Sequence, residues 1–264
     1  MNLQLNGKRA LVTGSTAGIG FATACALAAE GAEVILNGRS RAGVTEAEAR
    51  LRAAVPGARA SGVAADLSSA GGCAALTALC PDVDVLVNNL GIFDPQPFEA
   101  ITDAEWFTFF ETNVMSGVRL ARHYLPAMKA RDWGRIVFIS SESGVCPPAE
   151  MIHYGMSKAA QISVARGLAE TCAGCGVTVN SVLPGPTRTE GVATFFSRLA
   201  DEQGVSVEQA ERDFFAHARP TSLLKRFIEP AEVAAMVAYL CSPLASATHG
   251  AALRVEGGVV RSMV

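Results

Sequence analysis

Short apolar runs alternate with longer segments of helical periodicity along the whole chain. The apolar runs lie at residues 9–13, 31–37, 58–65, 83–87, 135–139, 176–182 and 251–255. Runs of this length between helical segments are typical of buried strands in a parallel sheet. The pattern therefore predicts an α/β protein with a doubly wound, seven-stranded, mostly parallel sheet and helices on both faces. We expect one Rossmann-type domain over residues 1–264.

Start and stop signals bound the expected helices. Thr102 and Asp103 begin a long helical segment that reaches about residue 130, and Pro230 stands in the first turn of a helix that ends near Leu240. A further helix is expected over about 153–173, directly after the fifth apolar run.

Residues 190–219 depart from this alternation. They are more charged and amphipathic, with few strand-like runs, and they contain Phe195, Phe196, Phe214 and Phe215. Two short helices that form a flap over a cleft have this composition, and so does an ordinary pair of surface helices. We expect an insertion at about 190–225 that covers a substrate.

Composition and charge exclude several classes of protein. Half of the 264 residues are hydrophobic and 18% are charged, so the chain can bury a sizeable core. The net charge of -3 gives no indication of a nucleic-acid partner or of electrostatic attraction to a membrane. No apolar run approaches the ~20 residues of a membrane helix. The first residues lack the basic-then-apolar order of a signal peptide, so no leader is expected.

The seven cysteines are scattered without a pattern, which favours reduced thiols in a cytoplasmic protein. Cys172 and Cys175 have the spacing of a Cys-x-x-Cys pair, but no second cysteine pair or histidine pair accompanies them. We therefore expect no metal site.

A glycine-rich turn follows the first apolar run and opens the first helix. Gly14 allows a tight turn, Gly18 lets the backbone approach a pyrophosphate, and Gly20 lets the helix pack closely on the strand. Backbone N–H groups and the helix dipole at such a turn favour a phosphate. The position of this motif at the head of a β-α-β unit predicts a dinucleotide site.

The end of the second run indicates which dinucleotide binds. An acidic residue there would accept hydrogen bonds from the adenosine ribose, but this chain has Gly38 followed by Arg39. A guanidinium suits a 2′-phosphate. We therefore expect NADP(H) to be preferred, with NAD(H) possible.

Polar side chains follow several other runs. The Asp66 carboxylate could cap the next helix or contact an adenine, and the Asn89 amide could brace neighbouring strands or touch a ribose. Asn113 is a weak helix former within a helical segment, which marks either a functional residue or a surface position. Because the carboxyl ends of parallel strands share one edge of a sheet, we expect these strand-end residues to lie together.

Ser141, Tyr154 and Lys158 form the clearest candidate for chemistry. Ser141 follows a buried strand, while Tyr154 and Lys158 stand one helical turn apart on the same face. A neighbouring ammonium favours the phenolate and should lower the pKa of Tyr154 from its ordinary value near ~10, which would help proton transfer. The Ser141 hydroxyl could hold a carbonyl or alcohol oxygen beside the phenol.

Together these motifs resemble the compact, single-domain branch of the short-chain dehydrogenase/reductase family, and are similar to 3-oxoacyl-acyl-carrier-protein reductases. The matching residues are Thr13-Gly14-x-x-x-Gly18-Ile19-Gly20, Asp66, Asn88-Asn89-x-Gly91, Asn113, Ser141, Tyr154-x-x-x-Lys158 and Pro184-Gly185. Each motif is weak alone, but the set spans nearly the whole chain in this order and is highly specific. The resemblance implies hydride transfer between a nicotinamide and a ketone or secondary alcohol.

The resemblance also implies roles for particular residues. Tyr154 is implied as the general acid/base, Ser141 as the group that positions the substrate oxygen, Lys158 as the ligand of the nicotinamide ribose and Asn113 as the holder of a water in a proton relay. The implied cofactor contacts are Gly14, Ser15, Thr16, Gly18, Ile19, Gly20, Arg39, Ser40, Asp66, Leu67, Asn89, Gly91, Tyr154, Lys158, Pro184, Gly185, Thr187 and Thr189.

Two residues depart from the family pattern. Leu90 replaces the alanine of Asn-Asn-Ala-Gly, which puts a larger side chain near the cofactor. Ala17 stands where NADP-preferring members often have a basic residue, which weakens the NADP(H) preference without reversing it. The resemblance also implies a homotetramer built through the helices at about 103–130 and 153–173 and the last strand.

The substrate, a small carbonyl compound or alcohol, is expected in a largely apolar pocket. The candidate lining residues are Leu90, Phe93, Glu142, Cys146, Met151, His153 and Phe195. His153 could contact the substrate or be exposed, and Glu142 could brace a loop or select the substrate. Two alternatives to a general carbonyl reductase are a 3-oxoacyl-acyl-carrier-protein reductase proper and a nucleotide-sensing protein without catalysis. A sensor is expected to lose the tyrosine or the lysine, and this chain has both.

Overall fold

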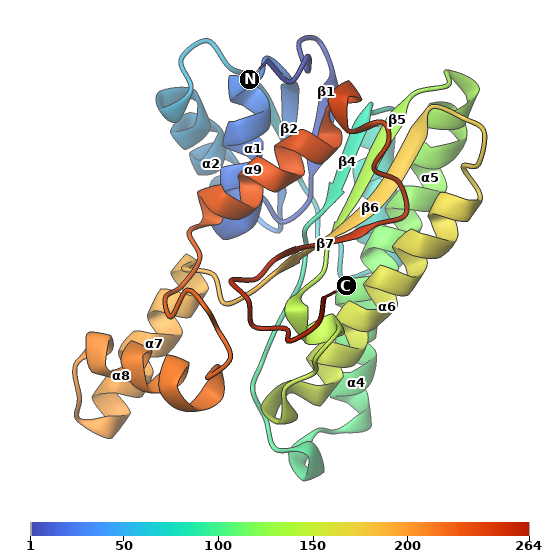
Figure 1. Ribbon diagram of the computed structural model, residues 1–264. Helices are drawn as coiled ribbons and strands as arrows, with labels where there is room; N and C mark the ends of the chain where they lie inside the picture. Colours follow the sequence, from blue (N-terminus) through green and yellow to red (C-terminus); the bar gives the residue numbers. More distant parts are fainter. Residues whose placement is uncertain (1, 264) are drawn as a thin grey trace.

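A seven-stranded sheet forms the middle layer of the protein (Figure 1). The computed structural model describes residues 2–263. The strands are β1 (Arg9–Val12), β2 (Glu33–Gly38), β3 (Arg59–Ala64), β4 (Val85–Asn88), β5 (Gly134–Ile139), β6 (Val177–Pro184) and β7 (Ala252–Val255). Their order is β3-β2-β1-β4-β5-β6-β7, and all neighbouring pairs are parallel. The predicted doubly wound sheet is confirmed, with the reversal of strand order between β1 and β4, where such folds bind ligands.

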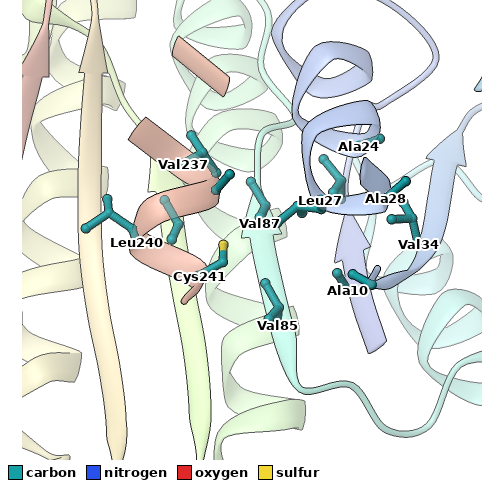
Figure 2. Close-up of a cluster of buried hydrophobic side chains, with 14 of the residues drawn as sticks. Ala10, Ala24, Leu27, Ala28, Val34, Val85, Val87, Val237, Leu240 and Cys241 are labelled. Atoms are coloured by element: carbon teal, nitrogen blue, oxygen red, sulfur yellow. The ribbon is translucent and has the colours of Figure 1, made fainter. Parts of the chain in front are cut away.

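Helices cover both faces of this sheet. One face carries α1 (Gly18–Ala29), α2 (Arg41–Ala54) and α9 (Pro230–Cys241), and the other carries α3 (Ala70–Leu79), α5 (Ser116–Ala130) and α6 (Ile152–Glu170). Figure 2 shows how the first face is filled: side chains of α1 and α9 pack over the valines of β4. Each large aliphatic side chain buried in this way contributes about 1.5–3 kcal/mol.

The last strand pair extends further than the apolar run predicts. β6 was expected to end at residue 182, but it continues to Pro184 because Leu183 pairs with Arg254 and Pro184 pairs with Val255. This extension carries the start of the following loop up to the carboxyl edge of the sheet.

The long helix predicted after Thr102 forms but is interrupted by a wider turn. It consists of α4 (Asp103–Phe109), a π-helical turn (Phe110–Met115) and α5. Thr102 and Glu105 close its beginning as a capping box. The wider turn contains Asn113, and π-helical turns are frequent at functional sites.

The flap, residues 190–225, stands beside the carboxyl edge of the sheet (Figure 1). It contains α7 (Glu190–Gln203), α8 (Val207–Asp213) and a π-helical turn (Phe214–Ala218). A small apolar cluster holds these helices together with the chain that follows the flap. Its buried members are Phe196, Ala200, Ala210, Phe215 and Phe227.

Short 3-10 turns lie at Phe98–Ala100, Glu142–Gly144, Ala149–Met151 and Pro243–Ala245. Across residues 2–263, no helix combines the length and the apolar character that crossing a bilayer requires.

Candidate active site

The glycine-rich turn joins β1 to α1 at the carboxyl edge of the sheet. Gly14 and Gly18 have φ angles of 58° and 56°, in the left-handed region that favours glycine. A Cβ on Gly20 would overlap the Asn89 amide and lie 2.5 Å from the Gly14 oxygen. The backbone conformation at Gly14 and Gly18 and the close packing at Gly20 therefore favour glycine at these three positions.

The first turn of α1 has no cap from the preceding side chain and binds a carboxylate from the start of α7. Ala17 precedes this helix and has no side-chain oxygen to cap it. The N–H of Gly18 donates to a carboxylate oxygen of Glu190, 2.9 Å away, which shows that this end of the helix accepts negative charge. Ile19 lines the large cleft described below. These features fit the pyrophosphate of a dinucleotide.

The end of β2 has no room for a side chain. A Cβ on Gly38 would lie 2.5 Å from Cγ2 of Thr16. Arg39 is exposed, and Ser40 caps α2 by accepting from the N–H of Gly43 (3.2 Å). Arg39 thus follows directly after the end of β2, and its charge helps to lower the pKa of Asp66. The hydroxyl of Thr16 lies beside Gly38, since a Cβ on Gly38 would be 3.6 Å from it.

Asp66 does not cap the next helix. Ser69 caps α3 by accepting from the N–H of Gly72 (3.1 Å), while Asp66 Oδ1 accepts from the N–H and hydroxyl of Ser68 (3.1 and 2.8 Å). These bonds hold the pKa of Asp66 below its ordinary value. Asp66 remains exposed at the rim, whereas its neighbour Leu67 is buried in the core.

Asn89 acts as a brace. Its Nδ2 donates to the main-chain oxygens of Thr13 (2.9 Å) and Gly14 (3.0 Å), so the amide ties β4 to the glycine turn. The hydroxyl of Ser15 also forms a hydrogen bond within the protein, because it accepts from the N–H of Asn37 (2.9 Å). Both side chains hold the shape of the turn.

Ser141, Tyr154 and Lys158 line one cleft. Ser141 lies two residues beyond the end of β5, and Tyr154 and Lys158 project from the first turns of α6. Nζ of Lys158 is 5.5 Å from the centre of the Tyr154 ring. A Cβ on Gly91 would lie 3.2 Å from that Nζ, so the loop after β4 closes over the ammonium.

The expected lowering of the Tyr154 pKa is wrong for the protein without cofactor. Burial raises the pKa of the phenol, and the charge of Glu142 raises it further, while a hydrogen bond with Ser141 and the charge of Arg219 act in the opposite direction. Lys158 does not supply the expected stabilisation because burial lowers its own pKa to about 7.

The ammonium of Lys158 is held by two acceptors. It donates to the main-chain oxygen of Ile139 (2.9 Å) and to Oε1 of Gln161 (3.1 Å). Nε2 of Gln161 in turn donates to the main-chain oxygen of Asn113 (2.6 Å). Gln161 was not singled out from the sequence, although it lies three residues after Lys158 and therefore on the same face of α6.

Asn113 is fully buried, so the surface alternative for this residue is wrong. Its Oδ1 accepts from the N–H of Ile92 (2.8 Å), and its Nδ2 donates to Ile92 O (3.0 Å) and Ser157 Oγ (2.9 Å). The side chain therefore ties the π-helical turn to the loop after β4 and to α6.

The end of β6 contributes the other wall of the site. Pro184, Gly185, Thr187 and Thr189 all line the cleft. The hydroxyl of Thr187 donates to Gly185 O (2.9 Å), and that of Thr189 accepts from the first turn of α7. Thr189 lies against the glycine turn, because a Cβ on Gly18 would be 3.1 Å from its Cγ2.

The cleft has a volume of about 440 Å³ and runs from Ile19, in the first turn of α1, to the flap. Of the candidate substrate contacts, those that line it are Phe93, Glu142, Met151 and Phe195. The flap adds Phe196, Leu199, Phe214 and Arg219 to the same wall. The flap therefore borders the cleft, as the first of the two alternatives for residues 190–219 requires.

Three candidate substrate contacts lie elsewhere. Leu90 packs against the glycine turn and against the core between the sheet and the helices α3, α5 and α6. Cys146 is exposed and does not line the cleft. His153 is fully buried, with its ring centre 3.9 Å from that of Phe109, so both alternatives for this histidine are wrong. The reason is helical geometry: His153 and Tyr154 are neighbours in sequence and point about 100° apart around α6. Burial lowers the pKa of His153.

A buried ion pair lies beside Ser141 in the cleft. Nε of Arg219 lies 3.7 Å from Oε1 of Glu142, and Oε2 of Glu142 accepts a short hydrogen bond from the hydroxyl of Ser141. Nη1 of Arg219 also donates to Oε1 of Glu150 (3.0 Å). Arg219 could not be found from the sequence, because it lies 77 positions after Glu142 and belongs to no motif.

Among residues 2–263 there is no cluster of three or more potential metal-binding side chains. The site instead combines a nucleotide turn with a serine, a tyrosine and a lysine. Residues 8–200 match the family model of the short chain dehydrogenases. The chain belongs to this family.

Relatives extend over the full length of this short chain dehydrogenase. It is 49% identical to the uncharacterized oxidoreductase YvaG of Bacillus subtilis, with 100% of both chains covered. It is 33% identical to the 3-oxoacyl-acyl-carrier-protein reductase FabG of Aquifex aeolicus, over 98% of this chain and 100% of the relative. L-sorbose reductase of Gluconobacter frateurii, solved with NADPH and L-sorbose, superposes with a TM-score of 0.93 at 30% identity, over 100% of both chains.

The family resemblance predicted from the motifs is therefore confirmed. A short chain dehydrogenase with oxidoreductase relatives and a neighbour that binds NADPH is an NAD(P)-dependent oxidoreductase.

Proposed function

We propose that this short chain dehydrogenase is an NADP(H)-dependent carbonyl reductase and alcohol dehydrogenase that uses Tyr154 as its general acid and base. The observation that carries the proposal is the convergence of Ser141, Tyr154 and Lys158 in one cleft. Ile19 of the glycine-rich motif and Asn89, which braces the glycine turn, line the same cleft. A cleft that contains both a nucleotide site and a positioned phenol suits proton transfer coupled to hydride transfer.

When bound, the reduced nicotinamide supplies a hydride to the carbonyl carbon. Tyr154 gives its phenolic proton to the carbonyl oxygen, so the ketone gains two electrons and two hydrogens and becomes an alcohol. Ser141 holds that oxygen during the transfer, for which its hydroxyl turns its single proton from Oε2 of Glu142 to the substrate. Lys158 binds the nicotinamide ribose and, when it carries its proton, stabilises the phenolate that Tyr154 leaves behind. The reverse steps oxidise an alcohol.

Preference for NADP(H) belongs to this proposal. Arg39 is exposed at the rim of the adenosine half of the site, and no acidic side chain occupies the end of β2. The L-sorbose reductase neighbour is described with NADPH. A positive charge at this position favours a 2′-phosphate, and an acidic one would repel it.

A 3-oxoacyl-acyl-carrier-protein reductase is less well supported. Such an enzyme is expected to present a basic patch near the entrance, for which Arg188 and Arg198 are the candidates. Arg188 pairs with Glu211 (2.6 Å) and Arg198 pairs with Glu202 (3.6 Å). Both charges are therefore locally balanced, and an acidic carrier protein gains little from them.

The test is the Tyr154→Phe variant assayed with NADPH and a panel of ketones. We expect kcat to fall by at least about 10³-fold, within the range that removal of a general acid costs, while NADPH binding followed by fluorescence is largely kept. Tyr239→Phe, which removes a phenolic hydroxyl in α9, is the matched control and should keep the wild-type kcat. Substantial activity in Tyr154→Phe would remove Tyr154 from the proposed mechanism.

A further inference from the structure

The proposed reaction leaves one feature of the cleft unused, the ion pair between Glu142 and Arg219. Both side chains line the cleft, yet only 7% of the Glu142 side chain and 9% of the Arg219 side chain are exposed. Oε2 of Glu142 accepts from the hydroxyl of Ser141. The carboxylate is therefore one hydrogen bond away from the group proposed to hold the reacting oxygen.

Both charged groups have hydrogen-bonding capacity left. A carboxylate can accept about four hydrogen bonds. The described protein contacts of the Glu142 carboxylate are the hydroxyl of Ser141 on Oε2 and the guanidinium of Arg219 near Oε1. For Arg219, Nη1 donates to Glu150 and to the main-chain oxygen of Ala218 (2.8 Å), and Nε faces Glu142. Among these described contacts, Nη2 of Arg219 has no protein partner. About two of the four hydrogen bonds that the Glu142 carboxylate can accept also remain available.

The remainder of the cleft wall toward the flap is apolar. Its members include Phe93, Phe195, Phe196, Leu199 and Phe214. A ligand that fits both parts has a polar group beside its reacting carbon and an apolar portion further away. Covering the ion pair with an apolar substituent would remove two charges from water without replacing their hydrogen bonds, which is unfavourable.

The polar group that matches the pair is a neutral hydroxyl. It can donate to the carboxylate of Glu142 and accept from the guanidinium of Arg219 at the same time. A carboxylate on the substrate would meet the negative charges of Glu142 and Glu150, and an ammonium would meet the positive charge of Arg219. Because Glu142 directly follows Ser141 and bonds to it, the hydroxyl within reach is the one attached next to the carbonyl carbon.

We propose that Glu142 and Arg219 form a hydroxyl-recognition site, and that the preferred substrates are α-hydroxyketones with an apolar remainder and the corresponding 1,2-diols. The proposal rests on the proposed function for the reaction itself, whereas recognition of the hydroxyl depends only on the cleft. Glu142 is thus a specificity-determining residue, which is the second of its two alternatives from the sequence.

The test compares ketones that differ only in a hydroxyl against a methyl group. Hydroxyacetone is matched with 2-butanone, and 1-hydroxy-2-hexanone with 3-heptanone. With NADPH, we expect kcat/KM to be about 10- to 100-fold higher for each hydroxyketone, the discrimination that hydrogen bonds to charged groups give. Glu142→Gln should reduce this ratio about tenfold. Glu202→Gln, which removes an exposed carboxylate from an ion pair on the flap, should keep the wild-type ratio.

Binding measurements distinguish a protein that does not recognise the hydroxyl from one that recognises it but does not catalyse the reaction. The dissociation constants of 1,2-hexanediol and 3-heptanol are measured by calorimetry on the Tyr154→Phe variant loaded with NADP+, and we expect the diol to bind at least about tenfold more tightly. Preferential diol binding together with no turnover of any ketone by the wild-type protein would support the hydroxyl site and overturn the proposed function.

Other outcomes overturn the hydroxyl site. Turnover of both members of a pair with equal kcat/KM would do so, and so would a ratio that Glu142→Gln leaves unchanged. If Glu142→Gln does not fold, Glu142→Asp is the second variant, because it keeps the charge and withdraws the carboxylate by one methylene group. An unchanged ratio in Glu142→Asp would count equally against the proposal.

Discussion

The ammonium of Lys158 lies 3.1 Å from Oε1 of Gln161, whose Nε2 donates to the main-chain oxygen of Asn113. The three residues come from two different segments, α6 and the π-helical turn before α5. An amide orients a charged donor but does not carry a proton at ordinary pH. Gln161 therefore fixes the position of the lysine and occupies the main-chain oxygen of Asn113. Asn113 is the residue that the family resemblance implies as the holder of a water in a proton relay.

Replacing this amide by a carboxylate should change the acidity of the lysine. In Gln161→Glu, a negative charge beside Nζ raises the pKa of Lys158 above its value of about 7. We expect the charged lysine to be the active form, so the fall in kcat/KM with rising pH should move to higher pH by about one unit. The measurement is the pH profile of ketone reduction with NADPH. Gln203→Glu on the exposed part of α7 is the control, and an unshifted profile in Gln161→Glu would contradict the role of Gln161.

Lys158 should also make folding stability depend on pH. Burial lowers its pKa from 10.5 to about 7, so between these values the unfolded chain binds more protons than the folded one. The contribution of Lys158 to the free energy of unfolding therefore rises with pH across this window. Lys158→Met removes the penalty, and we expect it to increase stability by roughly 1–3 kcal/mol at pH 6, after the loss of two hydrogen bonds is subtracted.

The gain in Lys158→Met should shrink between pH 7 and about pH 10, where the wild-type lysine loses its charge in both states. Thermal unfolding of the cofactor-free protein at several pH values checks this. Lys225→Met is the control at an exposed site on the flap, and its difference from the wild type should not follow the same course. A gain that is constant with pH in Lys158→Met would show that the amine is not buried in a charged form.

Arg39 is expected to select the cofactor. Arg39→Asp places an acidic group at the rim, where it repels a 2′-phosphate and accepts hydrogen bonds from a free ribose. We expect the ratio of kcat/KM for NADPH over that for NADH to fall by at least about 10²-fold, with the change mainly in KM. Arg41→Asp, also exposed and only two residues away, is the matched control. An equal effect of both variants would indicate a general charge effect in place of a specific contact.

Gly20 is expected to be irreplaceable for steric reasons. Its missing Cβ would overlap the Asn89 amide that braces the glycine turn. We expect Gly20→Ala to cost about 1–3 kcal/mol of stability and to weaken NADPH binding. Gly167→Ala in α6 is the control, because a Cβ there has nothing within 4 Å, and it should stabilise the protein by about 0.5–1 kcal/mol. Similar behaviour of the two variants in thermal unfolding and NADPH titration would argue against the steric account.

The parts of the fold that depend on local patterns could be predicted from the sequence. The strands, the glycine turn and the start of α4 at Thr102 each follow from the chemistry of a few neighbouring residues. The π-helical turn around Asn113 could not, because the residues there have no distinguishing pattern. Within this turn, the Asn113 side chain forms hydrogen bonds with Ile92 and Ser157, which lie outside it.

The same distinction holds within the site. Ser141, Tyr154 and Lys158 were recognisable because they form motifs, whereas Arg219 reaches Glu142 through the folding of the flap. The prediction that His153 contacts the substrate is wrong because residues adjacent in a helix point in different directions. Tyr154 lines the cleft, whereas His153 is buried against Phe109. The direction of the Tyr154 pKa shift was wrong because burial, which the sequence does not give, outweighs a neighbouring amine.

The contact between Thr16 and the bare backbone of Gly38 restricts how this protein could change its cofactor over evolutionary time. Any residue with a Cβ at position 38 meets the methyl group of Thr16 at 2.5 Å. An acidic group at the end of β2 therefore becomes acceptable only when the Thr16 side chain turns away or position 16 has become smaller, so the effects of substitutions at the two positions are coupled. Position 39 has no such barrier, and it offers the shorter mutational path to a different dinucleotide.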